Sequence, residues 1–323
     1  MQKKLNVVFT IDENYIQHFC VACTSLLDNN KNIGRIFLVQ DIEEENKKLL
    51  SAINYLEQYY YVKIEKLSLD SKILENFKIT HHVSKATYFR LLLSEILPKD
   101  IDSVMFLDSD IVVNDSLDGI LELDFLREDN LYVSHQDGLN ETTYSSNYEY
   151  YIFAVNHKYG EDELLRLRGI GFEGNKYFNA GIMYINLKKW REDDISSILI
   201  ENAIKYNDHL LWWDQDVLNI TFDKEWGELE HKYNNFDLND RLECDNSVIV
   251  HYIGFVKPWH FMCQHPCKHL YWKYLKNTPF KDYKYPDLNI KNCVLKYTPL
   301  KLQIMIGKVL PKFLKEKIKC NAS

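Results

Sequence analysis

The sequence predicts an α/β fold in which a mostly parallel sheet is covered by helices on both faces. Short apolar runs at 5–11, 35–40 and 62–67 have the length and composition of buried strands. Helical patterns at 15–28 and 43–59 lie between them. Strands that alternate with helices of this length form βαβ units, so these segments predict parallel strands. Hydrophobic residues make up 46% of the 323 residues, which is enough to bury a substantial core.

The following elements continue this pattern. Ser84 can cap a helix that ends before Pro98, and the run at 103–108 is expected to be a fourth strand. Residues 140–176 are polar and rich in tyrosine, and we expect loops and short helices there. A strand leading into a helix is expected at 177–190, and another strand at 248–253. Ligands of such sheets bind beyond the carboxyl ends of the strands, where Asp12 and Asp108 lie.

Charge divides the chain into two parts. The formal net charge is −8, but residues 291–323 contain eight lysines and one glutamate, so this tail carries +7 and the first 290 residues carry −15. We expect one α/β domain at 1–280 and a basic amphipathic helical tail at 281–323. Such an acidic body argues against nucleic acid as a partner.

The tail has two interpretations. Apolar residues at 302, 305, 306 and 309 fall at helical spacing on one side, so the tail can pack on the domain as a terminal helix. It can also bind peripherally to an anionic membrane surface, to which each lysine contributes about 1 kcal/mol. We find no signal peptide and no run of the roughly 18 apolar residues that a spanning helix needs.

The cysteines predict a reducing, intracellular setting, because there are seven of them without a disulfide-like spacing. Residues 260–269, HFMCQHPCKH, are rich in histidine and cysteine, but their spacing matches no standard zinc finger. Free thiols in a loop are therefore the favoured interpretation, with zinc as the alternative. Cys20 and Cys23 lie in a predicted helix and are expected to be small buried hydrophobes.

The stretch MFLDSDIVV, residues 105–113, places two carboxylates between apolar runs. Asp108 and Asp110 can reach one point beyond the strand, where their carboxylates can bind a hard divalent cation such as Mn²⁺ or Mg²⁺. A solvated turn or cap is the structural alternative.

The stretch VIVHYIGFVKPW, residues 248–259, groups three residues suited to a metal–diphosphate. His251 ends an apolar strand, Gly254 allows close approach of the backbone, and Lys257 can bind a phosphate. A histidine in an apolar strand is alternatively a satisfied core residue. The chain has no Gly-x-Gly-x-x-Gly after its first strand and no Walker motif, so a phosphate would need the metal or the lysine.

A third constellation combines YFNAGIMYINLKKW, at 177–190, with WWDQDVLN, at 212–219. Asn179 and Gly181 precede a buried run, and Asp214 and Gln215 open a predicted helix. An asparagine turn and an aspartate N-cap explain these residues equally well at this point.

In their order along the chain, the motifs FxxDxNY, ATYxRL, FLDxD, YFNAG–INLxxW, DQDxLN and HYxGxxKPW resemble glycosyltransferase family 8. The similarity covers about residues 5–260 and is greatest to the bacterial lipopolysaccharide galactosyl- and glucosyltransferases. It implies the nucleotide-diphosphosugar transferase type A fold, which is Rossmann-like, in a catalytic domain at 1–280. It also implies a retaining, Mn²⁺-dependent enzyme with a UDP-sugar donor.

The resemblance assigns a role to each matching residue. It makes Asp108, Asp110 and His251 the metal ligands, and Gly254 and Lys257 the residues that hold the diphosphate. Mg²⁺ is the alternative to Mn²⁺. The metal would stabilise the charge that develops on the departing UDP.

Other matching residues would surround the nucleoside and the sugar. Asp12 and Asn14 would contact uridine, and Arg90 would approach the donor sugar and Asp108. The residues expected around the transferred sugar are Asn179, Gly181, Asp214 and Gln215. Asp137 is assigned to the acceptor side, where the motif VSHQDG is shifted by one residue. Because Gln215 is a poor nucleophile, attack by the acceptor on the front face is preferred to a covalent intermediate.

The expected partners are UDP-galactose or UDP-glucose and a saccharide acceptor, which a lipid can carry. The expected location is the cytoplasm, with peripheral binding to the inner membrane. Two other classes stay open from the residues alone. One is a haloacid-dehalogenase-like, Mg²⁺-dependent phosphatase, whose nucleophile motif is also a strand ending in Asp-x-Asp. The other is a non-catalytic module that binds nucleotide sugars.

Overall fold

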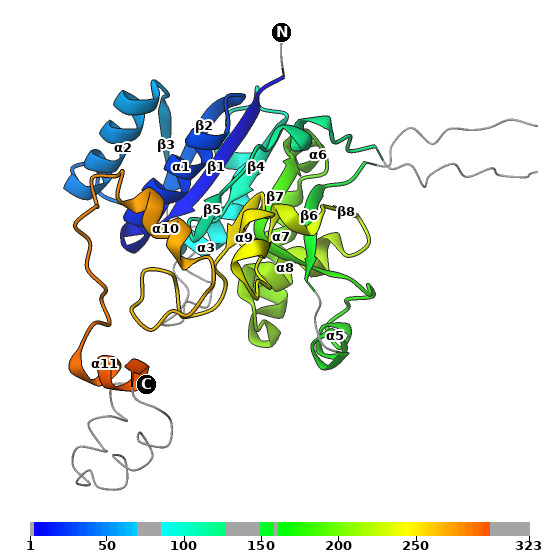
Figure 1. Cartoon of the computed structure of the whole chain (residues 1–323). Coiled ribbons are helices and arrows are strands. Elements are labelled where there is room, and N and C mark those ends of the chain that lie inside the picture. Colours follow the sequence, from blue (N-terminus) through cyan, green and yellow to red (C-terminus); the bar gives the residue numbers. More distant parts are fainter. Residues whose placement is uncertain (1–2, 70–84, 127–148, 158–160, 298–323) are drawn as a thin grey trace, which may run out of the picture.

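A seven-stranded sheet forms the centre of the protein, as seen in a computed structural model that describes residues 3–69, 85–126, 149–157 and 161–297 (Figure 1). The strand order is β3-β2-β1-β4-β7-β6-β8. Only β7 runs against its neighbours, so the sheet is mostly parallel, as predicted. The strands span Leu5–Ile11 (β1), Ile33–Gln40 (β2), Ile64–Ser68 (β3), Ser103–Leu107 (β4), Ile152–His157 (β6), Tyr177–Asn186 (β7) and Trp226–Glu228 (β8).

Helices cover both faces of this sheet because its central strands are apolar on both sides. In β1, Val7 and Phe9 pack into one hydrophobic cluster, while Val8 between them packs into the other. On the first face lie α1 (Ile16–Asn29) and α2 (Lys47–Tyr60). On the second lie α3 (Lys85–Tyr88), a 3₁₀ turn (Phe89–Leu92), α4 (Leu93–Ile96), α6 (Leu187–Glu192), α7 (Ile195–Tyr206) and α8 (Trp213–Phe222).

A second, two-stranded sheet lies beside the first. Its strands are β5 (Ile111–Val113) and β9 (Ile249–His251), which pair antiparallel. Val112 and Val250 pack with Tyr271 and Leu275 of α10 (Lys268–Leu275). Two further short helices are α5 (Glu161–Arg168) and α9 (Arg241–Asp245).

The structure confirms the strands and helices that periodicity predicted in the first 68 residues, the strand at 103–108, and the strand–helix unit at 177–190. The expectation of only loops and short helices at 140–176 is wrong at 152–157, where β6 pairs with β7 and β8 inside the main sheet. The single helix expected to end before Pro98 is divided into α3, a 3₁₀ turn and α4. Its proposed cap, Ser84, lies outside the described residues.

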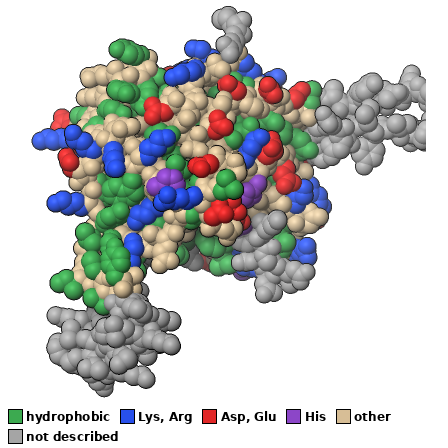
Figure 2. Space-filling view, viewed as in Figure 1, with side chains coloured by type: hydrophobic (Ala, Val, Ile, Leu, Met, Phe, Trp, Pro, Cys, Tyr) green, Lys and Arg blue, Asp and Glu red, His purple; other side chains and the backbone are tan. Residues whose placement is uncertain are grey.

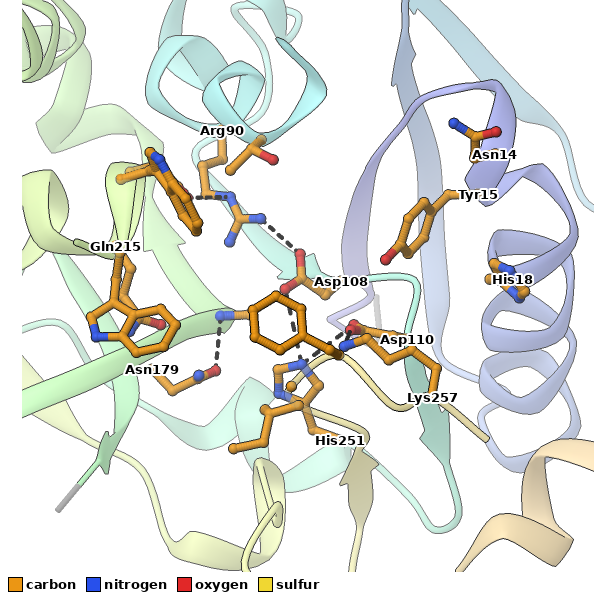
Figure 3. Close-up of a pocket in the computed structure, with 18 of the residues that line it drawn as sticks. Asn14, Tyr15, His18, Arg90, Asp108, Asp110, Asn179, Gln215, His251 and Lys257 are labelled. Atoms are coloured by element: carbon orange, nitrogen blue, oxygen red, sulfur yellow. Dashed lines mark hydrogen bonds and ion pairs between the residues drawn. The ribbon is translucent and has the colours of Figure 1, made fainter. Parts of the chain in front are cut away.

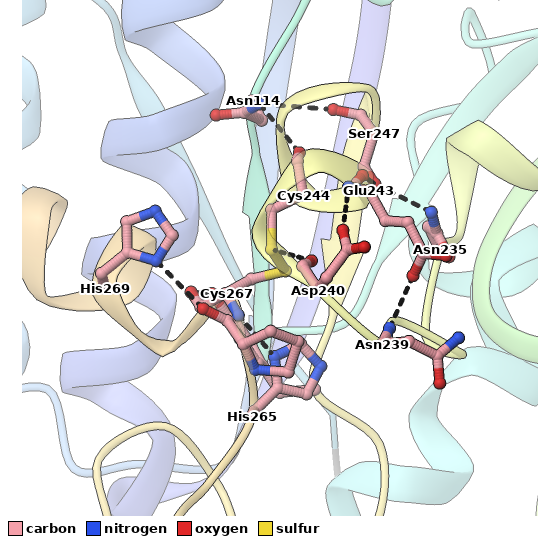
Figure 4. Close-up of a disulfide and its surroundings, with 12 residues drawn as sticks. Asn114, Asn235, Asn239, Asp240, Glu243, Cys244, Ser247, His265, Cys267 and His269 are labelled. Carbon is pink, nitrogen blue, oxygen red and sulfur yellow. Dashed lines mark hydrogen bonds between the residues drawn. A yellow bond between two sulfur atoms is a disulfide. The ribbon is translucent and has the colours of Figure 1, made fainter.

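A disulfide joins Cys244, in α9, to Cys267, which precedes α10 (Figure 4). The prediction of free thiols in the loop 260–269 is therefore wrong for Cys267, although Cys263 is a free, buried thiol. The partner cysteines are 23 residues apart in sequence, and both belong to the hydrophobic cluster that contains Val250 of β9 and residues of α10. Cys20 and Cys23 are buried in α1, as predicted.

The last described helix, α11 (Ile290–Tyr297), packs on the loop that follows β9. Lys296 donates from Nζ to the carbonyl of Phe261, and Asp287 accepts the backbone N–H groups of Phe261 and Met262. Several hydrophobic side chains near α11 are nevertheless exposed, and Figure 2 shows a hydrophobic group at this corner. The rest of the predicted tail, 298–323, lies outside the described residues. Within the described ranges, no helix is long and apolar enough to cross a bilayer.

Candidate active site

The candidate site lies at the edge of the main sheet where β1 and β4 have their carboxyl ends. Since β7 runs antiparallel to β4, its first residues reach the same edge, and the N–H of Asp108 donates to the carbonyl of Gly181 at 2.8 Å. A cavity of about 910 Å³ opens there, within the size range of small-molecule sites. Figure 3 shows side chains from α1, β7, α8 and the β9 segment converging on it.

Asp108, Asp110 and His251 form a group that could hold a metal ion. Each offers one ligand atom, and these atoms lie within 4.8 Å of one another. His251 Nε2 lies 3.3 Å from Asp110 Oδ1 and 4.0 Å from Asp108 Oδ2. Among the described residues, it is the one such group of histidine, cysteine, aspartate or glutamate.

The hydrogen bonds behind His251 determine which of its nitrogens faces the carboxylates. The N–H of Gly181 can only donate, so Asn179 Oδ1 accepts there, at 3.0 Å. Asn179 Oδ1 also faces Asn234 Nδ2 at 2.9 Å, which makes Asn234 Oδ1 the atom that accepts from His251 Nδ1 at 2.8 Å. In the neutral imidazole, the lone pair of Nε2 therefore points at two carboxylates. Three electron-pair donors, Nε2 of His251 and the carboxylates of Asp108 and Asp110, therefore face one another without a proton between them, which suits a bound cation. A metal-ligating histidine typically has its other ring nitrogen hydrogen-bonded, as Nδ1 is here.

Arg90 lies between the half-buried carboxylate of Asp108 and the buried carboxylate of Asp214. It donates from Nη2 to Asp108 Oδ1 at 2.8 Å and from Nη1 to the carbonyl of Ala180 at 2.8 Å, and its Nε lies 2.9 Å from Asp214 Oδ2. Burial raises the pKa of Asp214 to about 7 despite this guanidinium. Burial also raises the pKa of Asp108, and the charge of Asp110 adds to the rise.

Lys257 reaches the metal group from the loop after β9. Its Nζ lies 2.6 Å from Asp110 Oδ2 and donates to the carbonyl of Tyr252 at 2.7 Å. Burial opposes ionisation of Asp110, but the positive charge of Lys257 and its hydrogen bond hold the pKa of Asp110 well below the ordinary value. The loop turns at Gly254, whose φ of +81° is a conformation that favours glycine.

The charge of the site fits a divalent cation. When the carboxylates of Asp108, Asp110 and Asp214 are all ionised, they face the two cations Arg90 and Lys257, which leaves one net negative charge before histidine is counted. Two carboxylate oxygens and one imidazole nitrogen also suit Mn²⁺ or Mg²⁺ as a donor set.

Most of the residues singled out from the sequence line the same cavity: Asn14, Arg90, Asp108, Asp110, Asn179, Gly181, Asp214, Gln215, His251, Gly254 and Lys257. Asp12 does not line it. Instead, Asp12 Oδ1 accepts from the N–H of Asn14 and caps the short turn that presents Asn14. Asp137 lies outside the described residues. The ligand roles of all these residues stay predictions.

Sequence reasoning missed the aromatic lining of the cavity, which includes Tyr15, His18, Trp212, Trp213, Phe255, Trp259 and Tyr283. His18 stacks on Trp259 with ring centroids 3.4 Å apart, and its Nδ1 is bonded to the hydroxyl of Tyr271 at 2.7 Å. The presence of Tyr15 and Trp259 in the motifs FxxDxNY and HYxGxxKPW was a usable signal. Trp212, which is 41% exposed, opens the stretch WWDQDVLN, but that stretch was read for its carboxylates and amide and not for its tryptophans.

A mostly parallel sheet with this site at its edge defines an α/β protein of the nucleotide-diphosphosugar transferase type A fold. Residues 6–263 match the family model described as Glycosyl transferase family 8, so the chain belongs to glycosyltransferase family 8.

Relatives and solved structures agree with this family. The lipopolysaccharide 1,2-glucosyltransferase of Escherichia coli K12 is 25% identical, over 86% of this chain and 79% of that protein. The lipopolysaccharide 1,3-galactosyltransferase of Salmonella typhimurium LT2 is 27% identical, over 86% of this chain and 79% of that protein. A crystal structure of the galactosyltransferase LgtC in complex with donor and acceptor sugar analogues is 26% identical, with a TM-score of 0.68, and covers 85% of this chain and 96% of that chain.

Proposed function

We propose that this glycosyltransferase moves a hexose, galactose or glucose, from a UDP-sugar to a saccharide acceptor, and that it needs Mn²⁺ or Mg²⁺ and retains the anomeric configuration. The observation that carries the proposal is the convergence of Asp108, Asp110 and His251 on one point beside Lys257, inside the cavity. A hard cation with carboxylate ligands is suited to a diphosphate, and names of relatives that contain glucosyl- or galactosyltransferase support a hexose.

Each side chain of the site has a task in this reaction. A divalent cation bound by the three ligands would act as a Lewis acid toward the leaving UDP. Lys257 would add fixed positive charge at the same place, so the leaving group would need no general acid. Asn14 would bind the uridine at the α1 side of the cavity, and Asp12 would hold the turn that presents Asn14. Gly254 would bring backbone close to the diphosphate. Arg90, Asn179, Gly181, Asp214 and Gln215 would surround the sugar.

Retention needs either a covalent carboxylate intermediate or attack on the face that the leaving group vacates. The carboxylates next to Gln215 in α8 are both engaged. Asp214 is paired with Arg90, and Asp216 is fully buried with both oxygens accepting hydrogen bonds. Since the Gln215 amide is a poor nucleophile, this arrangement supports front-face attack by the acceptor hydroxyl.

The acceptor belongs, in this proposal, to lipopolysaccharide or another surface glycan and is carried by a lipid, with Asp137 on the acceptor side. The enzyme would then work in the cytoplasm, bound peripherally at the inner membrane. The names of the relatives, the lysine-rich tail and the exposed hydrophobic side chains of α11 support this. The disulfide is compatible with a reducing compartment because Cys244 and Cys267 are fully buried, which limits access of reductants.

The test is a panel of UDP-sugars incubated with Mn²⁺ in the absence of acceptor and scored for UDP release. We expect UDP-galactose or UDP-glucose to be hydrolysed slowly, and Asp110→Asn to lose most of this activity while it stays folded. Release of phosphate from phosphomonoesters instead would identify a phosphatase. Binding of UDP-sugar without any turnover, even with saccharide acceptors, would identify a non-catalytic binding module.

A further inference from the structure

Asp216 lies in the first turn of α8 and has no solvent exposure, yet four donors surround its carboxylate. Its Oδ2 accepts from the backbone N–H groups of Leu211 at 2.8 Å and Trp212 at 3.0 Å, and from Arg166 Nη2 at 3.0 Å. Its Oδ1 accepts from the hydroxyl of Tyr177 at 2.7 Å. Asp216 does not line the cavity, so its role has to be exerted through these neighbours.

Two of the four donors hold the corner that leads into α8. Trp213, directly after this pair, has a φ of +43°, which is an unfavourable conformation for a bulky residue. Such a residue persists only where the surrounding structure fixes it, and the bonds from Leu211 and Trp212 to Asp216 do so. Arg166 also donates to the carbonyl of His209 at 2.6 Å, which ties α5 to the same corner.

The fourth donor connects Asp216 to the cavity. The hydroxyl of Tyr177 has one proton, which it donates to Asp216, so it turns a lone pair toward Gln215 and accepts from Gln215 Nε2 at 3.2 Å. The other end of the amide is fixed by a group that can only donate, because Gln215 Oε1 accepts from the N–H of Ala180 at 2.9 Å. The amide orientation of Gln215 is thus determined from both ends.

We propose that Asp216 is a positioning residue that fixes the orientation of the Gln215 amide through Tyr177. The inference rests on the proposed function for what Gln215 does, since Figure 3 places Gln215 at the end of the cavity where the sugar would lie. A carboxylate suits this task because it only accepts. An asparagine at position 216 would have to turn its NH₂ group either toward the donors at 211, 212 and 166 or toward the hydroxyl of Tyr177. Because an NH₂ group accepts no hydrogen bond, the donors that it faced would lose their acceptor.

The first test separates positioning from support of the fold. Tyr177→Phe keeps the buried ring and removes only the hydroxyl between Asp216 and Gln215. We expect kcat of sugar transfer to fall between about tenfold and a hundredfold, as for a misplaced reacting group, with KM for the UDP-sugar nearly unchanged. The same substitution in a Gln215→Ala background should change kcat very little, because the amide to be oriented is gone. Equal losses in both backgrounds would overturn the proposal.

A second variant and a matched control address Asp216 itself. Asp216→Asn should lower kcat as Tyr177→Phe does, and the two together should cost no more than Asp216→Asn alone. Asp223 ends the same helix and accepts the N–H of Glu173 at 3.0 Å, without contact to Gln215. Asp223→Asn should therefore lower thermal stability and leave kcat unchanged. A loss of kcat in Asp223→Asn equal to that in Asp216→Asn would refute a positioning role.

A readout that does not depend on turnover distinguishes this inference from the proposed function. With selective ¹⁵N-glutamine labelling, the side-chain signal of Gln215 is the one that Gln215→Ala removes. We expect Tyr177→Phe and Asp216→Asn to shift this signal, and Asp223→Asn to leave it in place. A signal that stays in place in Tyr177→Phe would overturn the positioning role. A shift in a protein that turns over no UDP-sugar would support positioning and refute the proposed function.

Discussion

Replacing Gly181 by alanine would place a methyl group between two of the proposed metal ligands. The added Cβ would overlap Cε1 of His251 and lie 2.7 Å from Asp108 Oδ2. Non-bonded heavy atoms settle at about 3.5 Å, so the carboxylate would have to move by roughly 0.8 Å, with a similar shift of the imidazole. Metal–ligand distances tolerate only about 0.2 Å. We therefore expect Mn²⁺ affinity to fall by about 10–100-fold, or about 1.4–2.8 kcal/mol.

The assay is a Mn²⁺ titration in the presence of UDP, followed by the electron paramagnetic resonance signal of free Mn²⁺. Gly34→Ala is the matched control, because its Cβ would lie 2.5 Å from Asn6 Oδ1 near the start of β2, at the opposite edge of the sheet. Both substitutions should cost about 1–3 kcal/mol of folding stability through overpacking. Only Gly181→Ala should bind Mn²⁺ more weakly than the parent protein. If it binds Mn²⁺ as tightly as the parent, the three residues are not the metal site.

Three further predictions concern the diphosphate, the product and the tail. Lys257→Ala should weaken UDP binding in Mn²⁺, measured by calorimetry, because it removes the cation beside Asp110; unchanged affinity would contradict the diphosphate assignment. An α-configured UDP-sugar should yield an α-linked glycoside by the anomeric proton coupling in NMR, and a β-linked product would exclude retention. Deleting residues 298–323 removes six lysines but leaves Lys296 on Phe261, so sedimentation with anionic vesicles at low salt should fall while activity on a soluble acceptor persists. Equal vesicle binding by both forms would rule out the anchor.

The sheet could be predicted where burial produces a repeating pattern. The apolar runs of β1, β2 and β4 are buried on both faces, and the helices between them have one apolar face. The strand β6 was not recognised, because its apolar run IFAV, at 152–155, directly follows a polar, tyrosine-rich segment. Its strand character comes from pairing with β7 and β8, which lie far along the chain. The disulfide was missed for the same reason, since it depends on how α9 and α10 pack around β9.

The candidate site was predictable where a functional residue stands in a distinctive motif. Asp108, Asp110, His251 and Lys257 were each identified, and they do lie together. The residues that hold these four side chains in place were not identified from the sequence. Asn234, which fixes the orientation of His251, lies in the unremarkable stretch YNNF, and nothing local indicates its contact with Asn179.

Pairing between β5 and β9 is what brings His251 to the two aspartates. Ile111 pairs with His251, and the N–H of Tyr252 donates to the carbonyl of Asp110 at 3.0 Å, so the histidine lies beside Asp110, which is 141 positions earlier in the chain. Each strand has only three residues, too few for a stable ladder by itself. A slip of one residue would turn His251 to the opposite face. The packing of Val112 and Val250 against α10, and the disulfide that brackets β9, therefore do more than stabilise the fold, because they hold the register on which the proposed metal group depends.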